Sequence, residues 1–364
     1  MKINKILFIL SLPNPIHGSS IVGKQIKESK IINKGIDARY INLSTSKSLD
    51  EIGKNPVIKI RRYFNILIKV FYNLIKHNPE KVYITIAAKG IGFYKDFPIA
   101  LLVKLFGKKL FLHYHPKGVS ERQNLFFDNI LYKILFNKSK VILLSKSLYA
   151  DVKKYVSPRD VFYCANGIPI SKSLLKKNQN KNKTPQLLFL SNLIESKGVF
   201  ILLHALSLLK DQRILFYCNF IGAEGDICRD QFNAKLKDLN LHKHVSYLGK
   251  KYNDEKDKIF QNSDIFVFPT FYHNETLPLV VLEAMMWGIP IISTSEGAIG
   301  DMIINDETGF IVEKKNVEEL ANKIKFLIEN PIISKQMGER GNINFYKYYT
   351  VEVFEKNLLK ILNQ

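Results

Sequence analysis

The chain has 364 residues, of which 46% are hydrophobic and 24% charged, so it is long enough for two domains with full cores. The net charge is +21, and residues 1–170 hold 29 Lys+Arg and 10 Asp+Glu, a balance of 29 − 10 = +19. Three scattered cysteines without metal-type spacing exclude a disulfide framework and fit a reducing cytoplasm.

The uneven charge indicates an acidic partner surface. Residues 171–364 hold 25 Lys+Arg and 23 Asp+Glu, a balance of 25 − 23 = +2, so the first half alone is strongly basic. Such asymmetry is typical of proteins that bind membranes or nucleic acid. No apolar run approaches the roughly 18 residues that would span a bilayer. The apolar start of the chain lacks a signal-peptide cleavage site and is predicted to be a strand.

The first half begins with a strand, a helix and a second strand. The strands are predicted at 5–11 and 38–43, with the helix at 21–34 between them. Gly18 and Ser19 open this helix after a loop rich in Pro, Gly and Ser, so their amides are placed to receive a phosphate. An ordinary strand-to-helix turn explains the same residues equally well.

Residues 57–77 form a basic and apolar segment. It has five basic residues and no acidic ones. Its apolar positions follow helical spacing and are Ile60, Phe64, Leu67, Phe71, Leu74 and Ile75. Two interpretations are open: an interfacial helix on anionic lipid, or a domain helix whose apolar stripe packs in the core.

Further strands are predicted at 82–87, 109–113, 141–144 and 161–164. The strand at 109–113 leads into the sequence H-Y-H-P-K-G. A histidine at the carboxyl end of a strand lies where α/β proteins build their sites, which makes His115 a candidate, with a plain loop histidine as the alternative. No carboxylate or cysteine nearby completes a metal site with the two histidines, so no metal is expected.

A polar, basic stretch of low complexity, 171–184, is predicted to link two domains, 1–170 and 185–350. Helices and strands alternate again in the second domain. Its predicted strands are 186–190, 215–221, 245–248, 265–268, 291–294 and 309–312.

The segment 268–290 is predicted to hold the end of a strand, a polar loop and a helix that stops at Gly288. Asn274 and Thr276 are cap-type residues, and Pro278 suits the first helical turn. An apolar strand followed by a loop and a helix start is where α/β proteins hold anions.

The start of this helix offers backbone amides to a phosphate. One carboxylate precedes it and another follows it. The amides of Leu277, Leu279 and Val280 would face the phosphate, assisted by the helix dipole. Glu275 lies just before the helix and Glu283 inside it, roughly 12 Å or more apart. This separation is too long for a shared acid–base pair but is about the length of a nucleoside diphosphate sugar. Two unrelated glutamates in an ordinary α/β unit are the alternative.

The sequence from Glu275, E-T-L-P-L-V-V-L-E-A-M-M-W-G-I-P-I-I, resembles the Glu, seven residues, Glu motif of family 4 of the retaining glycosyltransferases. The P-T before it and the T-G-F-I-V after it agree, and the similarity runs from about 187 to 327. The resemblance implies an α/β protein of the GT-B fold, with two Rossmann-like doubly wound domains facing a central cleft. It also implies that a C-terminal helix, 351–364, packs back on the first domain.

The resemblance further implies roles for individual residues. Glu275 would hold sugar hydroxyls, Glu283 the ribose and Lys197 the leaving diphosphate. The implied catalytic residues are Glu275, His115 and Lys197. The implied donor-binding residues are Gly18, Ser19, Asn192, Lys197, Gly249, Glu275, Thr276, Leu277, Leu279 and Glu283.

Asn192 departs from the family, which has an arginine at this position near the lysine. An amide donates hydrogen bonds but brings no charge, so the phosphate site lacks one cation. No Asp-any-Asp motif occurs in the chain. Stabilisation of the leaving group by Lys197 and helix amides, without a metal or other cofactor, is therefore expected.

These features predict a retaining glycosyltransferase that is peripheral on the inner, cytoplasmic face of the membrane. It would move a sugar from a nucleotide-diphosphate sugar to a lipid-linked or other glycan acceptor in surface polysaccharide assembly, while bound to an anionic membrane surface. The alternatives are a catalytically inactive scaffold, which Asn192 permits, and a nucleotide-sugar epimerase of the same fold. Nucleic acid is not expected as a partner, because no nucleic-acid-binding motif accompanies the charge.

Overall fold

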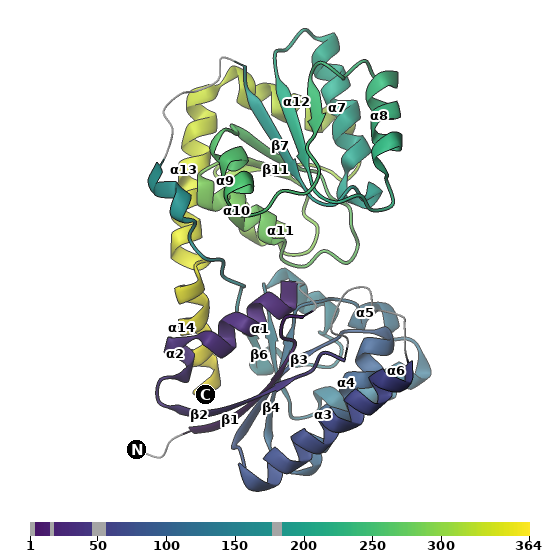
Figure 1. Ribbon diagram of the computed structural model, residues 1–364, viewed down its shortest axis with the longest axis vertical. Helices are drawn as coiled ribbons and strands as arrows, with labels where there is room; N and C mark the ends of the chain where they lie inside the picture. Colours follow the sequence, from purple (N-terminus) through teal and green to yellow (C-terminus); the bar gives the residue numbers. More distant parts are fainter. Residues whose placement is uncertain (1–3, 15–17, 46–55, 177–183) are drawn as a thin grey trace. The chain divides into compact units, whose positions relative to one another are not determined.

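The structure is a computed structural model that describes residues 4–14, 18–45, 56–176 and 184–364. It divides into two compact units, each with a six-stranded parallel sheet (Figure 1). The first domain comprises Met1–Gly167 and Val351–Gln364, and the second comprises Ile168–Thr350. Half of the predicted linker, residues 177–183, lies outside the described residues.

The sheet of the first domain has the strand order β2-β1-β3-β4-β5-β6, and all neighbours are parallel. Apart from the edge strand β2, its strands are almost continuously apolar because helices cover both faces. The strands are β1 (Asn4–Leu10), β2 (Ile36–Asn42), β3 (Lys81–Ile86), β4 (Lys109–Tyr114), β5 (Lys140–Leu143) and β6 (Val161–Tyr163).

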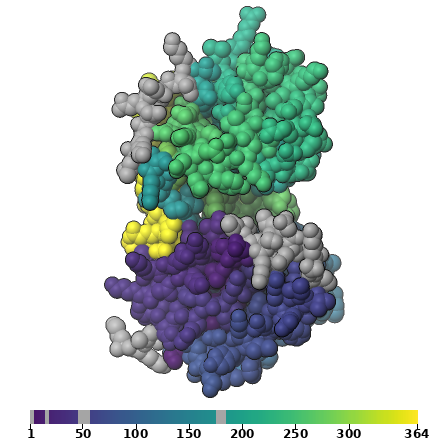
Figure 2. All heavy atoms as spheres, viewed as in Figure 1, coloured from purple at the N-terminus to yellow at the C-terminus, as the bar shows by residue number. Residues whose placement is uncertain are grey.

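Two layers of helices enclose this sheet (Figure 1). One face is covered by α1 (Gly18–Glu28), α2 (Lys30–Asn33) and the C-terminal α14 (Val351–Leu362), whose yellow spheres lie against the purple N-terminal segments in Figure 2. The other face is covered by α3 (Pro56–Lys76), α4 (Gly90–Leu105) and α6 (Phe126–Phe136). A short helix, α5 (Val119–Arg122), follows the loop after β4.

The second domain repeats the architecture with the order β12-β11-β10-β7-β8-β9. Its strands are β7 (Gln186–Leu190), β8 (Tyr217–Ile221), β9 (Val245–Tyr247), β10 (Ile265–Phe268), β11 (Ile291–Ser293) and β12 (Gly309–Ile311). Its helices are α7 (Val199–Asp211), α8 (Arg229–Asp238), α9 (Asn253–Gln261), α10 (Leu279–Trp287), α11 (Ile299–Met302), α12 (Val317–Glu329) and α13 (Pro331–Tyr348). The α/β class and the doubly wound sheets predicted from the sequence are confirmed.

Some predicted elements differ in the structure. The helix expected at 21–34 is interrupted, because Ser29 leaves α1 and caps α2 by accepting a hydrogen bond from the Ile32 amide at 2.9 Å. After β5 the chain forms a short 3₁₀ segment, Ser147–Asp151. Helices α6, α8 and α9 were not predicted from the sequence.

Helix α3 buries only part of the predicted apolar stripe. Its core contacts are Ile66, Val70 and Leu74, four residues apart. Four residues of the predicted stripe, by contrast, are between 48% and 58% exposed: Ile60, Phe64, Phe71 and Ile75. Leu74 and the partly buried Leu67 are the members of the stripe that pack on the core, so the interpretation that the stripe packs in the core holds for these two residues and is wrong for the other four. No helix within the described residues is long and apolar enough to cross a membrane.

Helix α13 fixes the end of α10 by a close backbone contact. Gly288 ends α10 in a left-handed conformation, with φ at 67°. A Cβ atom added to Gly338 in α13 would lie 2.1 Å from the Gly288 carbonyl oxygen and 3.1 Å from Pro290 Cδ. The two backbones can therefore approach as they do only because position 338 has no side chain.

We predict that Gly338→Ala lowers the free energy of unfolding by about 1–3 kcal/mol, because the new methyl group must push the two segments apart. Gly341→Ala in the same helix is the matched control, since its Cβ would have no neighbour closer than 3.9 Å. The control should leave stability unchanged or raise it by up to about 1 kcal/mol through helix propensity. Urea unfolding of both variants measures the difference, and equal stabilities would contradict the close-contact explanation.

Candidate functional site in the second domain

The strand order reverses between β7 and β10, which are adjacent and parallel. In a doubly wound sheet the chain leaves two such strands in opposite directions, so their carboxyl ends open a crevice where ligands bind. The loop after β7 contains the 3₁₀ segment Glu195–Lys197, and the loop after β10 leads to α10. The topology therefore brings together two segments that are almost 80 residues apart in sequence.

Lys197 and Glu275 form an ion pair at this position. Lys197 Nζ lies 2.5 Å from Glu275 Oε2, and the two side chains are only 14% and 10% exposed. The ammonium group also lies 4.2 Å from the centre of the Tyr272 ring. A carboxylate and an aromatic face thus hold one partly desolvated cation in a fixed place.

The backbone around Lys197 is locked to the loop after β10. Gly198 has φ at +87°, and a Cβ atom there would lie 2.3 Å from the Pro269 carbonyl oxygen. The Phe271 amide donates to the Ser196 carbonyl oxygen at 2.7 Å. Lys197 supplies the charge and Gly198 permits the packing, because only glycine allows this close approach.

Gly297, which was not predicted, lies close to the backbone of Glu275. Its φ is +59°, and an added Cβ atom would lie 2.5 Å from the Glu275 carbonyl oxygen and 2.6 Å from that of Thr276. The Ala298 amide donates to the Thr276 carbonyl oxygen at 2.6 Å. The glycine after β11 thus lets two loops close around the glutamate.

Helix α10 begins later than predicted. Its N-cap is Pro278, and no side chain caps it, so the prediction of Asn274 or Thr276 as cap is wrong. Leu277 lies before the helix and is buried, whereas Leu279 opens the first turn. An N-terminus without a side-chain cap leaves first-turn amides for a ligand.

Glu283 is bound by a lysine that sequence reasoning missed. Lys256 Nζ from α9 lies 2.6 Å from Glu283 Oε1, and both side chains are largely buried. Burial raises the pKa of Glu283 above its ordinary value, and Lys256 opposes this shift. Each of the two glutamates of the motif therefore has its own lysine.

Asn192 and Gly249 each contact the turn that follows β8. Asn192 Oδ1 accepts a hydrogen bond from the Ala223 amide at 3.2 Å. The Gly222 amide donates to the Gly249 carbonyl oxygen at 3.0 Å. Arg229 lies near the same turn, because its Nη2 would be 3.5 Å from a Cβ atom added to Gly249.

Arg229 was not singled out from the sequence. Its guanidinium group stacks over the Tyr247 ring at 4.6 Å, and the Tyr247 hydroxyl donates to the Gly222 carbonyl oxygen at 2.9 Å. A cation is therefore present at the turn that Asn192 holds. The signal for it was weak, because an arginine at the start of a polar helix is usually a solvated residue.

The remaining candidates belong to the first domain. His115 follows β4 and is buried, with its ring centre 4.3 Å from that of His113. His113 Nδ1 lies 2.6 Å from the Tyr83 hydroxyl. Burial, and secondarily His115, lower the pKa of His113 well below its ordinary value.

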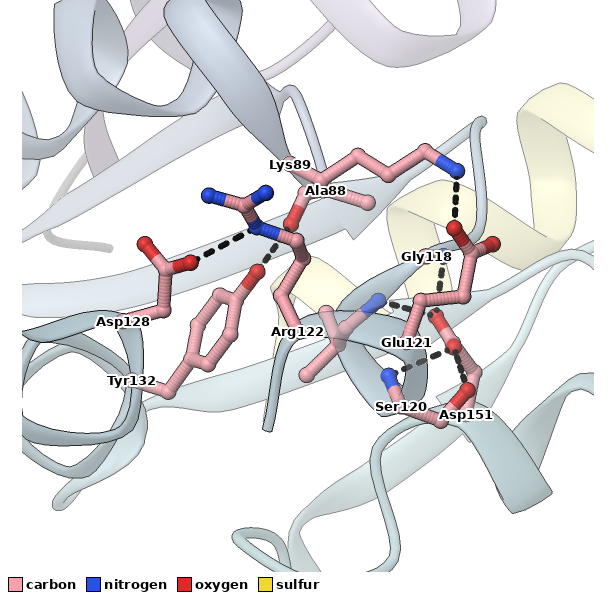
Figure 3. Close-up of polar contacts among 10 residues, drawn as sticks. Ala88, Lys89, Gly118, Ser120, Glu121, Arg122, Asp128, Tyr132 and Asp151 are labelled. Carbon is pink, nitrogen blue, oxygen red and sulfur yellow. Dashed lines mark hydrogen bonds and ion pairs between the residues drawn. The ribbon is translucent and has the colours of Figure 1, made fainter. Parts of the chain in front are cut away.

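Asp151, also missed from the sequence, holds the chain just after His115 (Figure 3). Its carboxylate accepts from the amides of Gly118, Val119 and Ser120 at 2.9, 3.1 and 2.9 Å, and from the Ser120 hydroxyl at 2.6 Å. Nearby ion pairs join Lys89 to Glu121 and Arg122 to Asp128 (Figure 3). The segment that follows His115 is therefore held in place by charged groups.

Gly18 and Ser19 form the start of α1. Among the described residues, no atom lies within 4 Å of a Cβ added to Gly18, so their packing does not require glycine there. The glycine that packing does require is Gly23, whose Cβ would lie 2.0 Å from the Ser11 carbonyl oxygen. Residues 15–17 of the predicted glycine loop lie outside the described residues.

The structure thus groups the predicted residues by domain. Gly18, Ser19 and His115 are in the first domain, and the other candidates are in the second. Within the described parts of the chain, no group of three or more His, Cys, Asp or Glu side chains is arranged to hold a metal ion.

Comparison with known proteins identifies the second domain. Residues 171–343 match the family described as glycosyl transferases group 1. The chain carries a group 1 glycosyltransferase domain. The resemblance that the motif around Glu275 indicated is confirmed.

Two curated relatives of this glycosyltransferase domain are informative. The chain is 29% identical over 228 residues to an uncharacterized glycosyltransferase of Methanocaldococcus jannaschii, an alignment that covers 63% of this chain and 60% of that protein. It is 26% identical over 214 residues to a capsular polysaccharide biosynthesis glycosyltransferase of Staphylococcus aureus, with 56% and 54% covered. The chain therefore spans little more than half the length of these relatives.

A solved structure extends the similarity to both domains. The Anabaena protein HepE, crystallised in complex with UDP and glucose, has a TM-score of 0.70 and 16% identity, and the match covers 99% of this chain and 100% of that one. At this level of identity the likeness shows the fold. The GT-B fold predicted for the chain is confirmed.

We predict that Lys256→Met lowers the free energy of unfolding at pH 7 by about 1–3 kcal/mol, because it leaves the Glu283 carboxylate buried without its cation. Since the folded state raises the pKa of Glu283, stability falls as the pH rises from the ordinary carboxyl value through the raised one. Losing Lys256 widens this pH interval and deepens the loss. Thermal unfolding between pH 4 and pH 8 measures the effect.

Adding Glu283→Gln to Lys256→Met should recover most of the lost stability and remove the pH dependence. The matched control is Lys356→Met, which breaks the exposed pair of Lys356 with Glu352 and should change stability by less than about 0.5 kcal/mol. If Lys256→Met behaves like this control, Glu283 does not depend on its lysine.

Proposed function

We propose that the chain is a retaining glycosyltransferase that transfers a sugar from a nucleotide-diphosphate sugar to a glycan acceptor carried on a membrane lipid. The observation that carries this proposal is the ion pair of Lys197 and Glu275 at the strand-order reversal of a group 1 glycosyltransferase domain. The pair lies beside the uncapped start of α10. A cation, helix amides and a carboxylate are what a diphosphate and its sugar require.

In the proposed reaction, the bond between the anomeric carbon and the diphosphate oxygen breaks, and its electron pair leaves with the phosphate. Lys197 and the first-turn amides of α10 stabilise the negative charge that develops there. The acceptor hydroxyl attacks the anomeric carbon from the face that the phosphate leaves, so the configuration is retained. The proton of this hydroxyl passes to the departing phosphate oxygen. Glu275 orients the sugar hydroxyls and holds Lys197 in position through their ion pair.

The other candidates have supporting roles in this proposal. Glu283, kept ionised by Lys256, accepts hydrogen bonds from the ribose. The turn at Gly249 contacts the base through its backbone. UDP is the first nucleotide to test, because the structurally similar Anabaena protein was crystallised with it.

The acceptor is proposed from the relatives and from charge. One relative is named for capsular polysaccharide biosynthesis, and the first half of this chain carries +19 of the +21 net charge. An acceptor on a lipid at the inner face of the cytoplasmic membrane, within surface polysaccharide assembly, fits both observations.

We predict that Glu275→Gln and Lys197→Ala each reduce sugar transfer at least tenfold, or about 1.4 kcal/mol of activation free energy, while the protein stays folded. Both variants remove charge at the reacting centre. Transfer to lipid extract is measured in detergent with radiolabelled UDP-sugars, and folding is checked by circular dichroism.

The matched controls are Glu329→Gln and Lys325→Ala, which alter an exposed Lys–Glu pair on α12 in the same domain. They should leave transfer unchanged. If all four variants transfer sugar equally well, the Lys197–Glu275 pair has no part in the reaction. If wild-type protein binds UDP but transfers no sugar from any donor, the inactive-scaffold alternative is favoured.

We also predict that a chelator leaves transfer within about twofold of the untreated rate, because Lys197 and the helix amides are proposed to stabilise the leaving group. The measurement compares initial rates with and without excess EDTA. A complete loss of activity that added Mg²⁺ or Mn²⁺ restores would contradict the metal-independent mechanism.

A further inference from the structure

The outer side of one helix layer in the first domain is unusually apolar. Helices α3, α4 and α6 pack on the sheet through buried residues, yet each also exposes large apolar side chains to solvent. Ile68 of α3 is 65% exposed, Leu105 of α4 75% and Phe126 of α6 82%. Others on the same three helices are Ile60, Phe64, Phe71, Ile75, Ile91, Phe127, Ile130 and Ile134. We call this surface the α3–α4–α6 face.

The exposed residues are connected across the three helices. A groove of about 420 Å³ runs between α3 and α4 and has an apolar lining of Leu67, Ile68, Phe71, Pro98, Leu101, Leu102 and Leu105. Across α4 from this groove, the rings of Tyr94 and Phe127 lie 6.1 Å apart and join α4 to α6. The blue segments of α3 and α4 form part of the molecular surface in Figure 2. Apolar contacts thus link α3 to α4 and α4 to α6, so the exposed residues are not isolated positions.

The acidic residues of these helices are buried, so the charges that they expose are positive. Helix α3 carries five basic residues and no acidic one, α4 carries Lys95 and Lys104, and α6 carries Lys133. The acidic residues of the three helices are Asp96 and Asp128, and both are buried. Asp128 is bound by Arg122 and by the Tyr94 hydroxyl. The solvent-facing side of the layer therefore combines apolar groups with positive charge.

We propose that the α3–α4–α6 face docks on an anionic lipid bilayer. Its apolar side chains and the groove between α3 and α4 would contact the acyl chains, while the lysines and arginines contact the anionic headgroups. An amphipathic surface with cations beside exposed aromatic and branched residues fits the chemistry of that interface. Acidic residues, which would be repelled there, are kept inside the domain.

The proposal rests on the proposed function only in that a lipid-linked acceptor gives docking a purpose. Vesicle binding is therefore measured without donor or acceptor. The probe is a set of sedimentable vesicles of phosphatidylcholine alone, or with 40 mol% phosphatidylglycerol. We expect wild-type protein to bind the anionic vesicles at low salt, at least tenfold more weakly at 0.5 M NaCl, and the neutral vesicles at least tenfold more weakly than the anionic ones.

Two sets of substitutions separate charge from apolar contact. The charge set is Arg61→Glu, Lys69→Glu and Lys76→Glu. Arg62 is left unchanged because its guanidinium donates to the Thr45 carbonyl oxygen at 2.9 Å. The apolar set is Ile68→Gln, Leu105→Gln and Phe126→Gln. Each triple variant should reduce binding to anionic vesicles at least tenfold.

Matched controls come from exposed positions of the second domain. The charge control is Lys237→Glu, Lys243→Glu and Lys335→Glu, which changes the net charge equally. The apolar control is Leu215→Gln, Ile332→Gln and Ile343→Gln, whose side chains are as exposed as those of the test set. Both controls should bind vesicles within twofold of wild type. UDP binding and the unfolding temperature of every variant verify that the fold is intact.

Three results would overturn the proposal. The first is a wild-type protein that does not sediment with anionic vesicles at low salt. The second is a charge-set or apolar-set variant that binds as well as its matched control. The third is a stable dimer in analytical ultracentrifugation that the apolar set dissociates, because this face would then be an interface between two copies. If the protein fails to bind vesicles but transfers sugar normally in detergent, the docking proposal is wrong and the proposed function stands. If it binds vesicles but transfers no sugar, the proposed function is wrong and the docking proposal stands.

Discussion

The ion pair of Lys197 and Glu275 depends on the reversal of strand order between β7 and β10. That reversal sends the two following loops around the same crevice, so a lysine and a glutamate 78 residues apart come within 2.5 Å. Two glycines then make the approach possible, because Gly198 and Gly297 each lie where a Cβ atom would overlap a backbone carbonyl of the facing loop. The site is thus a product of sheet topology and close backbone packing, onto which the charges are placed.

Local patterns in the sequence predicted much of this arrangement. The bounds of β10, and the positions of Lys197 and Glu275 after apolar strands, follow from hydrophobic runs and from glycine and proline signals. Long-range partners could not be predicted in this way. Nothing near Glu283 in the sequence indicates Lys256, because α9 and α10 meet only in the folded domain.

Helix α3 shows a second limit of sequence patterns. Periodicity identified the helix but not its buried face, because apolar residues lie on two sides of it. Ile66, Val70 and Leu74 pack in the core, whereas four residues of the predicted stripe are exposed to solvent: Ile60, Phe64, Phe71 and Ile75. Hydrophobic spacing shows that a face is apolar, and only tertiary packing decides which of two apolar faces the domain buries. The second apolar face of α3 is informative, because a face that the domain does not bury is available to bind another surface.

The exchange of the family arginine for Asn192 has a physical consequence beyond the lost charge. Its side-chain oxygen accepts the Ala223 amide, which a guanidinium group cannot do because it has no acceptor. The substitution therefore replaces a cation with a hydrogen bond that fixes the turn after β8. Arg229 stacks on Tyr247 at this same turn, so positive charge is present there on a different element. With Lys197 held by Glu275 and Tyr272, the proposed phosphate site depends on one well-positioned cation and the helix amides, and this makes the placement of Lys197 more important than it would be beside an arginine.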